Sequence, residues 1–116
     1  MTSAALRAIA KPVVPKFDSK WEEKYHAHLV AQRNAGKIVE FWWKGFRLRV
    51  GEGAWYTPEA IVLANDGYLE LHEVKGYKRE AAMVRYRAAK ERYPFRAYLV
   101  RLKKGGEWVM EGDDGL

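Results

Sequence analysis

Residues 59–75 read EAIVLANDGYLELHEVK, with the turn-forming triplet Asn65-Asp66-Gly67 between two apolar runs. Apolar runs on both sides of such a triplet predict two antiparallel strands joined by a tight turn. A two-residue loop would set Ile61 opposite His72 and mix polar with apolar partners. A three-residue loop, with Gly67 in a left-handed conformation, sets Ile61 opposite Leu71. We predict the second register because it keeps each apolar set on one face.

This register places Glu59 directly opposite Glu73, with Cβ atoms about 5 Å apart on one face. Lys75 follows on the same face because side chains of a strand alternate. Two carboxylates facing each other are destabilising unless a raised pKa, the Lys75 ammonium or a divalent cation compensates. Magnesium prefers oxygen ligands of this kind, and the main-chain carbonyl of Val74 is a further candidate ligand.

The rest of the chain reads as one helix before the strand pair, further strands, and a second helix after it. The expected elements are a helix at 19–35, strands at 38–43 and 46–50, a helix at 79–93, and strands at 95–102 and 108–110. On the first helix, the apolar positions are Trp21, Tyr25, His28 and Leu29. A turn at 44–45 separates the first two strands.

Composition indicates a single globular domain. The chain has 116 residues, of which 48% are hydrophobic and 14% aromatic, and no internal repeat is evident. We predict a flexible arm at 1–16, one domain at 17–111 and a polar tail at 112–116. The absence of cysteine excludes disulfides and thiolate metal sites. No apolar run approaches the roughly 20 residues of a bilayer span, so we expect no membrane contact and a cytoplasmic location.

Three short motifs carry acidic residues in a fixed order along the predicted elements. They are Ser19-Lys20-Trp21-Glu22 on the first helix, Thr57-Pro58-Glu59 at the head of one strand, and Glu73-Val74-Lys75 on the next. Together they resemble the PD-(D/E)xK nuclease superfamily. Within it, the chain is most similar to small phage-encoded nucleases related to Holliday-junction resolvases and recombination endonucleases. The resemblance covers residues 17 to about 102.

The resemblance implies an α/β fold with a restriction-endonuclease-like αβββαβ core, in which helices flank a mixed central sheet. It also implies metal-dependent hydrolysis of DNA, with branched or junction DNA as substrate and Mg²⁺ or Mn²⁺ as cofactor. Glu59, Glu73 and Glu22 would hold the metal, and Lys75 would orient or activate the attacking water. Resolvases make paired cuts, so we expect a homodimer, in the host cytoplasm if the protein is phage-encoded.

The chain departs from the family pattern at one position, where Glu59 replaces an aspartate. The extra methylene moves the carboxylate by roughly 1.5 Å, more than a preorganised site tolerates. This departure leaves open a non-catalytic nucleic-acid-binding module that retains the nuclease scaffold. A protein-interaction domain on the same scaffold is a third reading.

Basic residues provide candidate phosphate contacts. The excess of 21 Lys and Arg over 15 Asp and Glu gives a net charge of +6, which favours a polyanionic partner. Lys78, Arg79 and Arg85 follow Lys75 closely, and Arg47 and Arg49 share one face of their strand. The alternative is a solvated helix face. Four aromatic residues could stack on unpaired bases or belong to the core or an interface: Trp42, Trp43, Trp55 and Tyr56.

Each acidic candidate also has a structural alternative. Ser19 and Glu22 have the spacing of a helix capping box, and Glu23 could replace Glu22 as the helix ligand. Glu59 and Glu73 could be solvated charges at a strand end, and Lys75 could simply pair with either acid. His72 falls on the opposite face from Glu73, so we interpret it as a surface or second-layer residue.

Overall fold

The computed structural model of the chain describes residues 15–74 and 80–112. Its elements are α2 (Lys20–Asn34), β1 (Ile38–Trp43), β2 (Leu48–Gly51), β3 (Ala54–Tyr56), β4 (Ala60–Ala64), β5 (Leu69–Val74), α3 (Glu80–Arg92), β6 (Arg96–Leu102) and β7 (Trp108–Glu111). The predicted elements are present, and β3 is a strand that was not predicted. No helix in the described ranges is long and apolar enough to cross a membrane.

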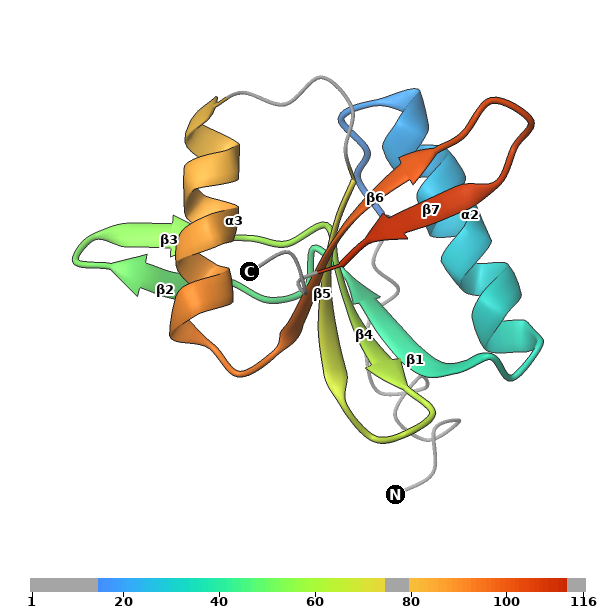
Figure 1. The fold of residues 1–116 in the computed structure, drawn as a ribbon, viewed down its shortest axis with the longest axis horizontal. Coiled ribbons are helices and arrows are strands. Elements are labelled where there is room, and N and C mark those ends of the chain that lie inside the picture. The colour runs from blue at the N-terminus through green and yellow to red at the C-terminus, as the bar shows by residue number, and fades with distance from the viewer. Residues whose placement is uncertain (1–14, 75–79, 113–116) are drawn as a thin grey trace.

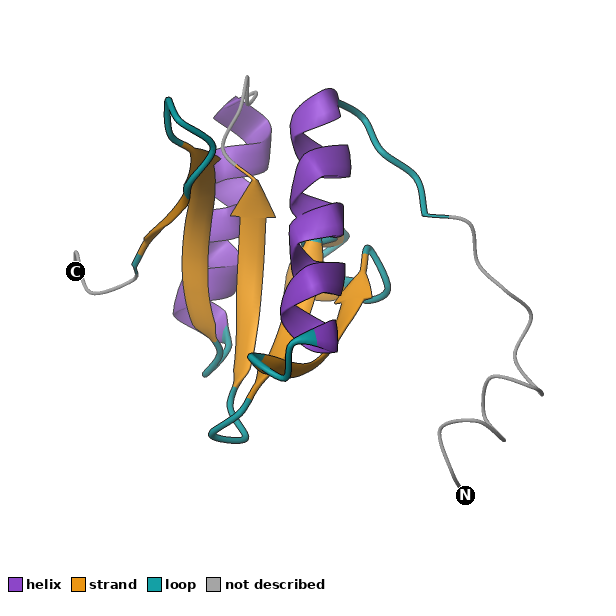
Figure 2. Ribbon diagram, turned by 90° about the vertical axis from the view of Figure 1, so that its right-hand side faces the viewer, coloured by secondary structure: helices purple, strands orange, loops and turns teal. Residues whose placement is uncertain are grey.

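Five strands form the central sheet in the order β1-β4-β5-β6-β7. Strands β5 and β6 are parallel and the other neighbours are antiparallel, so the sheet is mixed. Helix α3 makes the crossover that a parallel pair requires. Figures 1 and 2 show α2 and α3 on opposite sides of this sheet. The predicted mixed α/β class with two flanking helices is confirmed.

The predicted register of the β4–β5 hairpin is confirmed. Ile61 pairs with Leu71, and Leu63 pairs with Leu69. Gly67 has φ 89° and its N–H donates to the carbonyl of Ala64, which closes the three-residue loop. Glu59 immediately precedes the first paired residue of β4, so the register continues to Glu73.

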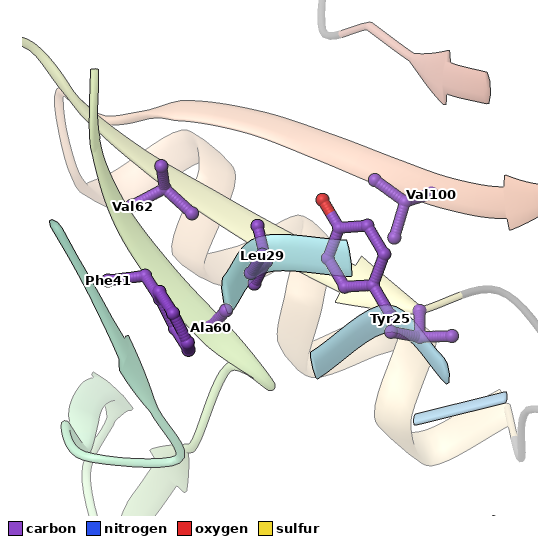
Figure 3. Packing of buried hydrophobic residues seen from close by; sticks show 7 residues of the cluster. Tyr25, Leu29, Phe41, Ala60, Val62 and Val100 are labelled. Atoms are coloured by element: carbon purple, nitrogen blue, oxygen red, sulfur yellow. The ribbon is translucent and has the colours of Figure 1, made fainter. Parts of the chain in front are cut away.

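Each face of the sheet is covered by its own apolar cluster. On the α2 side, Tyr25 and Leu29 pack against sheet residues such as Val62 and Val100 (Figure 3). On the other side, Tyr86 and Ala89 of α3 pack with residues of β3, β4, β5 and β6, which are Tyr56, Ile61, Leu71 and Ala97. Burying each large apolar side chain contributes roughly 1.5–3 kcal/mol, so both helices are held firmly.

Helix α2 begins at the predicted N-cap, where Ser19 Oγ accepts a hydrogen bond from the Glu22 N–H at 3.2 Å. Its buried residues are Glu22, Tyr25 and Leu29, at the i, i+3, i+7 spacing of one helix face. Trp21, one of the apolar positions of this helix, is 44% exposed. The helix is turned so that the neighbouring Glu22 points inward instead.

Strands β2 and β3 form a separate two-stranded sheet that contacts α3 rather than pairing with the central strands (Figure 1). The turn predicted at 44–45 therefore joins two strands that do not pair with each other. Lys44 has φ 49°, an uncommon value outside glycine. Its N–H donates to the Glu59 carbonyl at 2.7 Å. This bond continues the β1–β4 pairing by one residue beyond Trp43 and Ala60, and the chain leaves the central sheet after it.

Candidate active site

A pocket of about 650 Å³ lies where the end of β5, the start of β4 and the first turn of α2 meet. Its lining consists of Asp18, Ser19, Trp21, Glu22, Lys44, Trp55, Tyr56, Thr57, Glu59, Glu73, Val74, Ala82 and Arg85. The three predicted acids, which are far apart in the sequence, all lie in this lining. Val74 and Arg85 do so as well. The predicted catalytic Lys75 lies outside the described residues.

Glu59 and Glu73 are buried, with 5% and 3% of their surface exposed. One oxygen of Glu59 accepts a hydrogen bond from the Val74 N–H at 3.0 Å. One oxygen of Glu73 accepts a hydrogen bond from the Tyr56 hydroxyl at 2.8 Å. The interpretation of these acids as solvated charges at a strand end is therefore wrong. They point into the protein from adjacent strands.

Glu22 enters the pocket from the first turn of α2 and is also 5% exposed. Its carboxylate accepts a hydrogen bond from the Asp18 N–H at 3.1 Å and pairs with Lys44 Nζ at 2.8 Å. The capping alternative is thus correct in part, although the amide that Glu22 satisfies is that of Asp18 and not of Ser19. Glu23, the alternative helix ligand, is exposed and outside the pocket lining.

Lys44 is a pocket residue that the sequence reading missed. Besides Glu22, it contacts Asp18 Oδ2 at 3.1 Å. Partial burial lowers its pKa, but the hydrogen bonds and charges of Glu22 and Asp18 outweigh this effect and raise the pKa above its ordinary value. Lys44 therefore stays charged and partly balances the acidic lining. No sequence signal beyond its position in a turn marked it.

Tyr56 is the second pocket residue that the sequence did not predict as part of the acidic site. It was predicted only as an aromatic residue that could stack on bases or belong to the core. It is buried, and this burial, followed by the negative charge of Glu73, raises the pKa of Tyr56 above its ordinary value. The same two causes raise the pKa of Tyr86 to about 12. Tyr56 therefore remains a neutral hydrogen-bond donor to Glu73. Its place three residues before Glu59 was an available signal.

The donor set of the pocket suits a hard divalent cation. Glu59 and Glu73 supply carboxylate oxygens from facing strands, Val74 adds a main-chain carbonyl, and the lining contains no sulfur or imidazole ligand. In the present side-chain conformations, the described residues contain no group of three Asp, Glu, His or Cys side chains arranged to hold a metal.

No family model, curated protein or solved structure matches the chain. What the chain does is therefore inferred from the chemistry of the pocket and its surroundings.

The predicted basic contacts divide into three groups. Arg85 lies in the pocket lining. Arg47 and Arg49 are exposed on or beside β2 and outside the lining, but the Arg47 guanidinium lies 4.3 Å from the ring centroid of Trp55, a pocket residue. Arg49 Nε donates to the Gly51 carbonyl at 3.2 Å. Lys78 and Arg79 lie outside the described residues.

His72 lies on the face opposite Glu73, as predicted, but it is buried and not at the surface. Its Nδ1 is hydrogen-bonded to the Tyr25 hydroxyl, and its Nε2 lies 2.9 Å from Glu70 Oε1. Arg96 connects Glu70 to Asp66 at the hairpin turn. His72 thus belongs to a polar chain under α2, separate from the acidic pocket.

Proposed function

We propose that the chain is a metal-dependent nuclease of the PD-(D/E)xK type that hydrolyses DNA phosphodiester bonds, with branched or junction DNA as its preferred substrate. The carrying observation is that Glu59 and Glu73 meet across β4 and β5 in a pocket that also receives Glu22. Burying like charges close together is unfavourable unless a cation balances them. A divalent ion among these oxygens provides that balance.

The arrangement of the elements supports the same proposal. Taken in chain order, α2, β1, β4, β5, α3 and β6 follow the sequence αβββαβ. In this reading, β2 and β3 are an insertion after the first strand, and β7 is an added edge strand. Glu22 lies on α2, Glu59 immediately before β4 and Glu73 on β5, an order that supports the proposed motif assignment.

Glu59, Glu73 and the Val74 carbonyl would hold the ion, and Glu22 would complete the site from α2. When bound, a divalent cation lowers the pKa of water and stabilises negative charge on the phosphate. Tyr56 fixes Glu73 by its hydrogen bond, and Lys44 fixes Glu22. Lys75, next in the chain after Val74, is proposed to orient the attacking water.

Arg85 is placed to contact a phosphate, because it combines a positive charge with a position in the pocket lining. The net charge of +6 supports attraction to DNA at longer range. A homodimer, which would make paired cuts, and a cytoplasmic location belong to the same proposal. Sedimentation of the protein with and without junction DNA tests the dimer.

Incubation with a four-way junction and with linear DNA, in Mg²⁺, Mn²⁺ or EDTA, tests the activity. We expect cleavage that requires the metal and that Glu73→Gln and Glu59→Gln reduce by at least about a hundredfold, as expected for the loss of a metal ligand. Glu23→Gln is the matched control, because Glu23 is exposed and outside the pocket lining. Absence of cleavage by the wild type, or full cleavage by Glu73→Gln, rejects the proposal.

One observation favours a second candidate, a nucleic-acid-binding module without catalysis. Each of the three carboxylates has a protein partner that stabilises it without a metal: Lys44 for Glu22, the Val74 N–H for Glu59 and Tyr56 for Glu73. This candidate predicts salt-dependent DNA binding that is unchanged by Mg²⁺ or by Glu73→Gln, and no cleavage.

A further inference from the structure

The mouth of the acidic pocket carries two exposed tryptophans from opposite sides of the fold. Trp21 comes from the first turn of α2 and Trp55 from β3, and both belong to the pocket lining. They are 44% and 42% exposed. Single exposed apolar residues are common on protein surfaces, but two large aromatic rings that line one pocket together with buried carboxylates offer apolar surface for a ligand to cover.

A basic side chain accompanies each of these rings. Arg47 lies 4.3 Å from the centroid of the Trp55 ring, and Lys24 Nζ lies 5.5 Å from the centroid of the Trp21 ring. Both distances fall within the range of cation–π attraction. The rim therefore presents two aromatic surfaces with positive charge beside them, around a floor of buried carboxylates.

This combination matches the chemistry of an unpaired nucleotide strand. Bases without a pairing partner stack on aromatic side chains, while nearby arginine and lysine contact the phosphates that follow the strand. The bases of an intact duplex are already stacked on each other and offer no free face. A pocket of about 650 Å³ also has the size of a site for a small molecule or a nucleotide, rather than for a duplex.

We infer that Trp21 and Trp55 form a stacking clamp for unpaired bases next to the scissile phosphate, so that the substrate is DNA with single-stranded character at the cleavage point. This inference rests on the proposed nuclease function and narrows it. The two tryptophans are adjacent in sequence to Glu22 and to Tyr56, which holds Glu73. A base stacked on either ring would therefore lie at a fixed position relative to Glu22 and Glu73.

Binding measured in EDTA by fluorescence anisotropy tests the clamp without cleavage. The probes are oligothymidylate of about 12 nucleotides, an abasic strand of the same length and charge, and a blunt duplex. We expect the wild type to prefer oligothymidylate over both other probes. Trp21→Ala and Trp55→Ala should each weaken oligothymidylate binding by about 5- to 150-fold, with little change for the abasic strand.

Trp42→Ala is the matched control, because Trp42 is 37% exposed but lies outside the pocket lining. Trp55→Phe and Trp21→Phe should retain most of the binding, since phenylalanine also stacks. Thermal unfolding of each variant verifies that it is folded. Equal affinity for the abasic and thymidine strands, or an equal loss in Trp42→Ala, overturns the clamp.

Cleavage assays in Mg²⁺ separate the two proposals. A wild-type protein that cleaves DNA but binds the abasic strand as tightly as oligothymidylate overturns the clamp and leaves the nuclease assignment intact. A protein that prefers oligothymidylate through Trp21 and Trp55 but cleaves no DNA supports the stacking role and rejects the nuclease assignment.

Discussion

The carboxylate of Glu59 reaches from the start of β4 to the end of β5 and accepts a hydrogen bond from the Val74 N–H at 3.0 Å. The side chain thus extends the contact between the two strands beyond their last main-chain pair, Ala60 with His72. This role gives a physical reason for glutamate, and not aspartate, at position 59. Its additional methylene spans the distance to Val74.

Glu59→Asp should therefore lower the stability of the fold and, under the proposed function, its activity. The shorter side chain withdraws the carboxylate by roughly 1.5 Å and leaves the buried Val74 N–H without its acceptor. We expect the free energy of unfolding to fall by about 1–3 kcal/mol, with a loss of cleavage. Urea unfolding and junction cleavage measure the two effects. Increased activity in Glu59→Asp would contradict the proposed geometry.

Divalent metal should stabilise the folded chain. A ligand that binds only the folded state adds about 1.4 kcal/mol at ten times its dissociation constant. We expect Mg²⁺ to raise the melting temperature of the wild type and to have little effect on Glu73→Gln, which loses a proposed ligand. Glu23→Gln should respond like the wild type. Differential scanning fluorimetry across a Mg²⁺ titration measures these shifts in melting temperature. If Mg²⁺ stabilises Glu73→Gln as much as the wild type, Glu73 is not a metal ligand.

The Lys44–Glu22 pair should contribute more than an exposed ion pair. Glu22 is almost fully buried, so Lys44→Met leaves its charge with less compensation, and we expect a loss of about 1–3 kcal/mol. Arg33→Met provides the control, because Arg33 and Glu40 form a more exposed pair worth about 0–1 kcal/mol. A double-mutant cycle of Lys44→Met with Glu22→Gln isolates the coupling. A coupling energy near zero would mean that the pair does not stabilise the fold.

Tyr56 should make the protein sensitive to alkaline pH. Burial and the charge of Glu73 raise its pKa above the ordinary value of 10.0. The unfolded chain loses this proton at lower pH than the folded chain, so the stability that Tyr56 contributes is present below about pH 10 and lost as the pH rises further. Tyr56→Phe should flatten this decline in urea unfolding curves. Tyr68→Phe, at an exposed site, should leave the decline unchanged.

Tyr25→Phe should separate stability from activity. The change removes the hydroxyl partner of His72 Nδ1 beneath α2, and we expect a loss of about 1–3 kcal/mol. The rate of DNA cleavage should stay near that of the wild type, because Tyr25 is absent from the pocket lining. Tyr56→Phe, in contrast, should lower the rate because it removes a hydrogen bond that fixes Glu73. A rate loss in Tyr25→Phe at a temperature where the variant is folded would connect the two sites.

The β4–β5 hairpin was predictable because its register is a local problem. Only one pairing keeps Ile61 opposite Leu71 and Leu63 opposite Leu69, and that pairing brings Glu59 and Glu73 together. Glu22 was predictable from the motif order and from the spacing to Ser19. For these residues, alternation and capping already determine which way the side chain points.

Other features depend on contacts between distant segments. Trp21 occupies a helical position that suits the core, but it is 44% exposed and lines the pocket beside Glu22, which pairs with Lys44. β3 is only three residues long and alternates too briefly to be recognised as a strand. Lys44 approaches Glu22 because β1 lies beside β4 and α2. None of these contacts can be predicted from the hydrophobic periodicity of a single segment.

The independence of the β2–β3 ribbon has an evolutionary consequence. Its tip at 51–53 takes no part in the hydrogen-bond ladder of the five-stranded sheet, so insertions or substitutions there leave the register of the acidic strands intact. Selection can therefore vary the tip while Tyr56, at the far end of β3, keeps its hydrogen bond to Glu73. The surface beside the proposed site is free to diverge without disturbing the groups inside it.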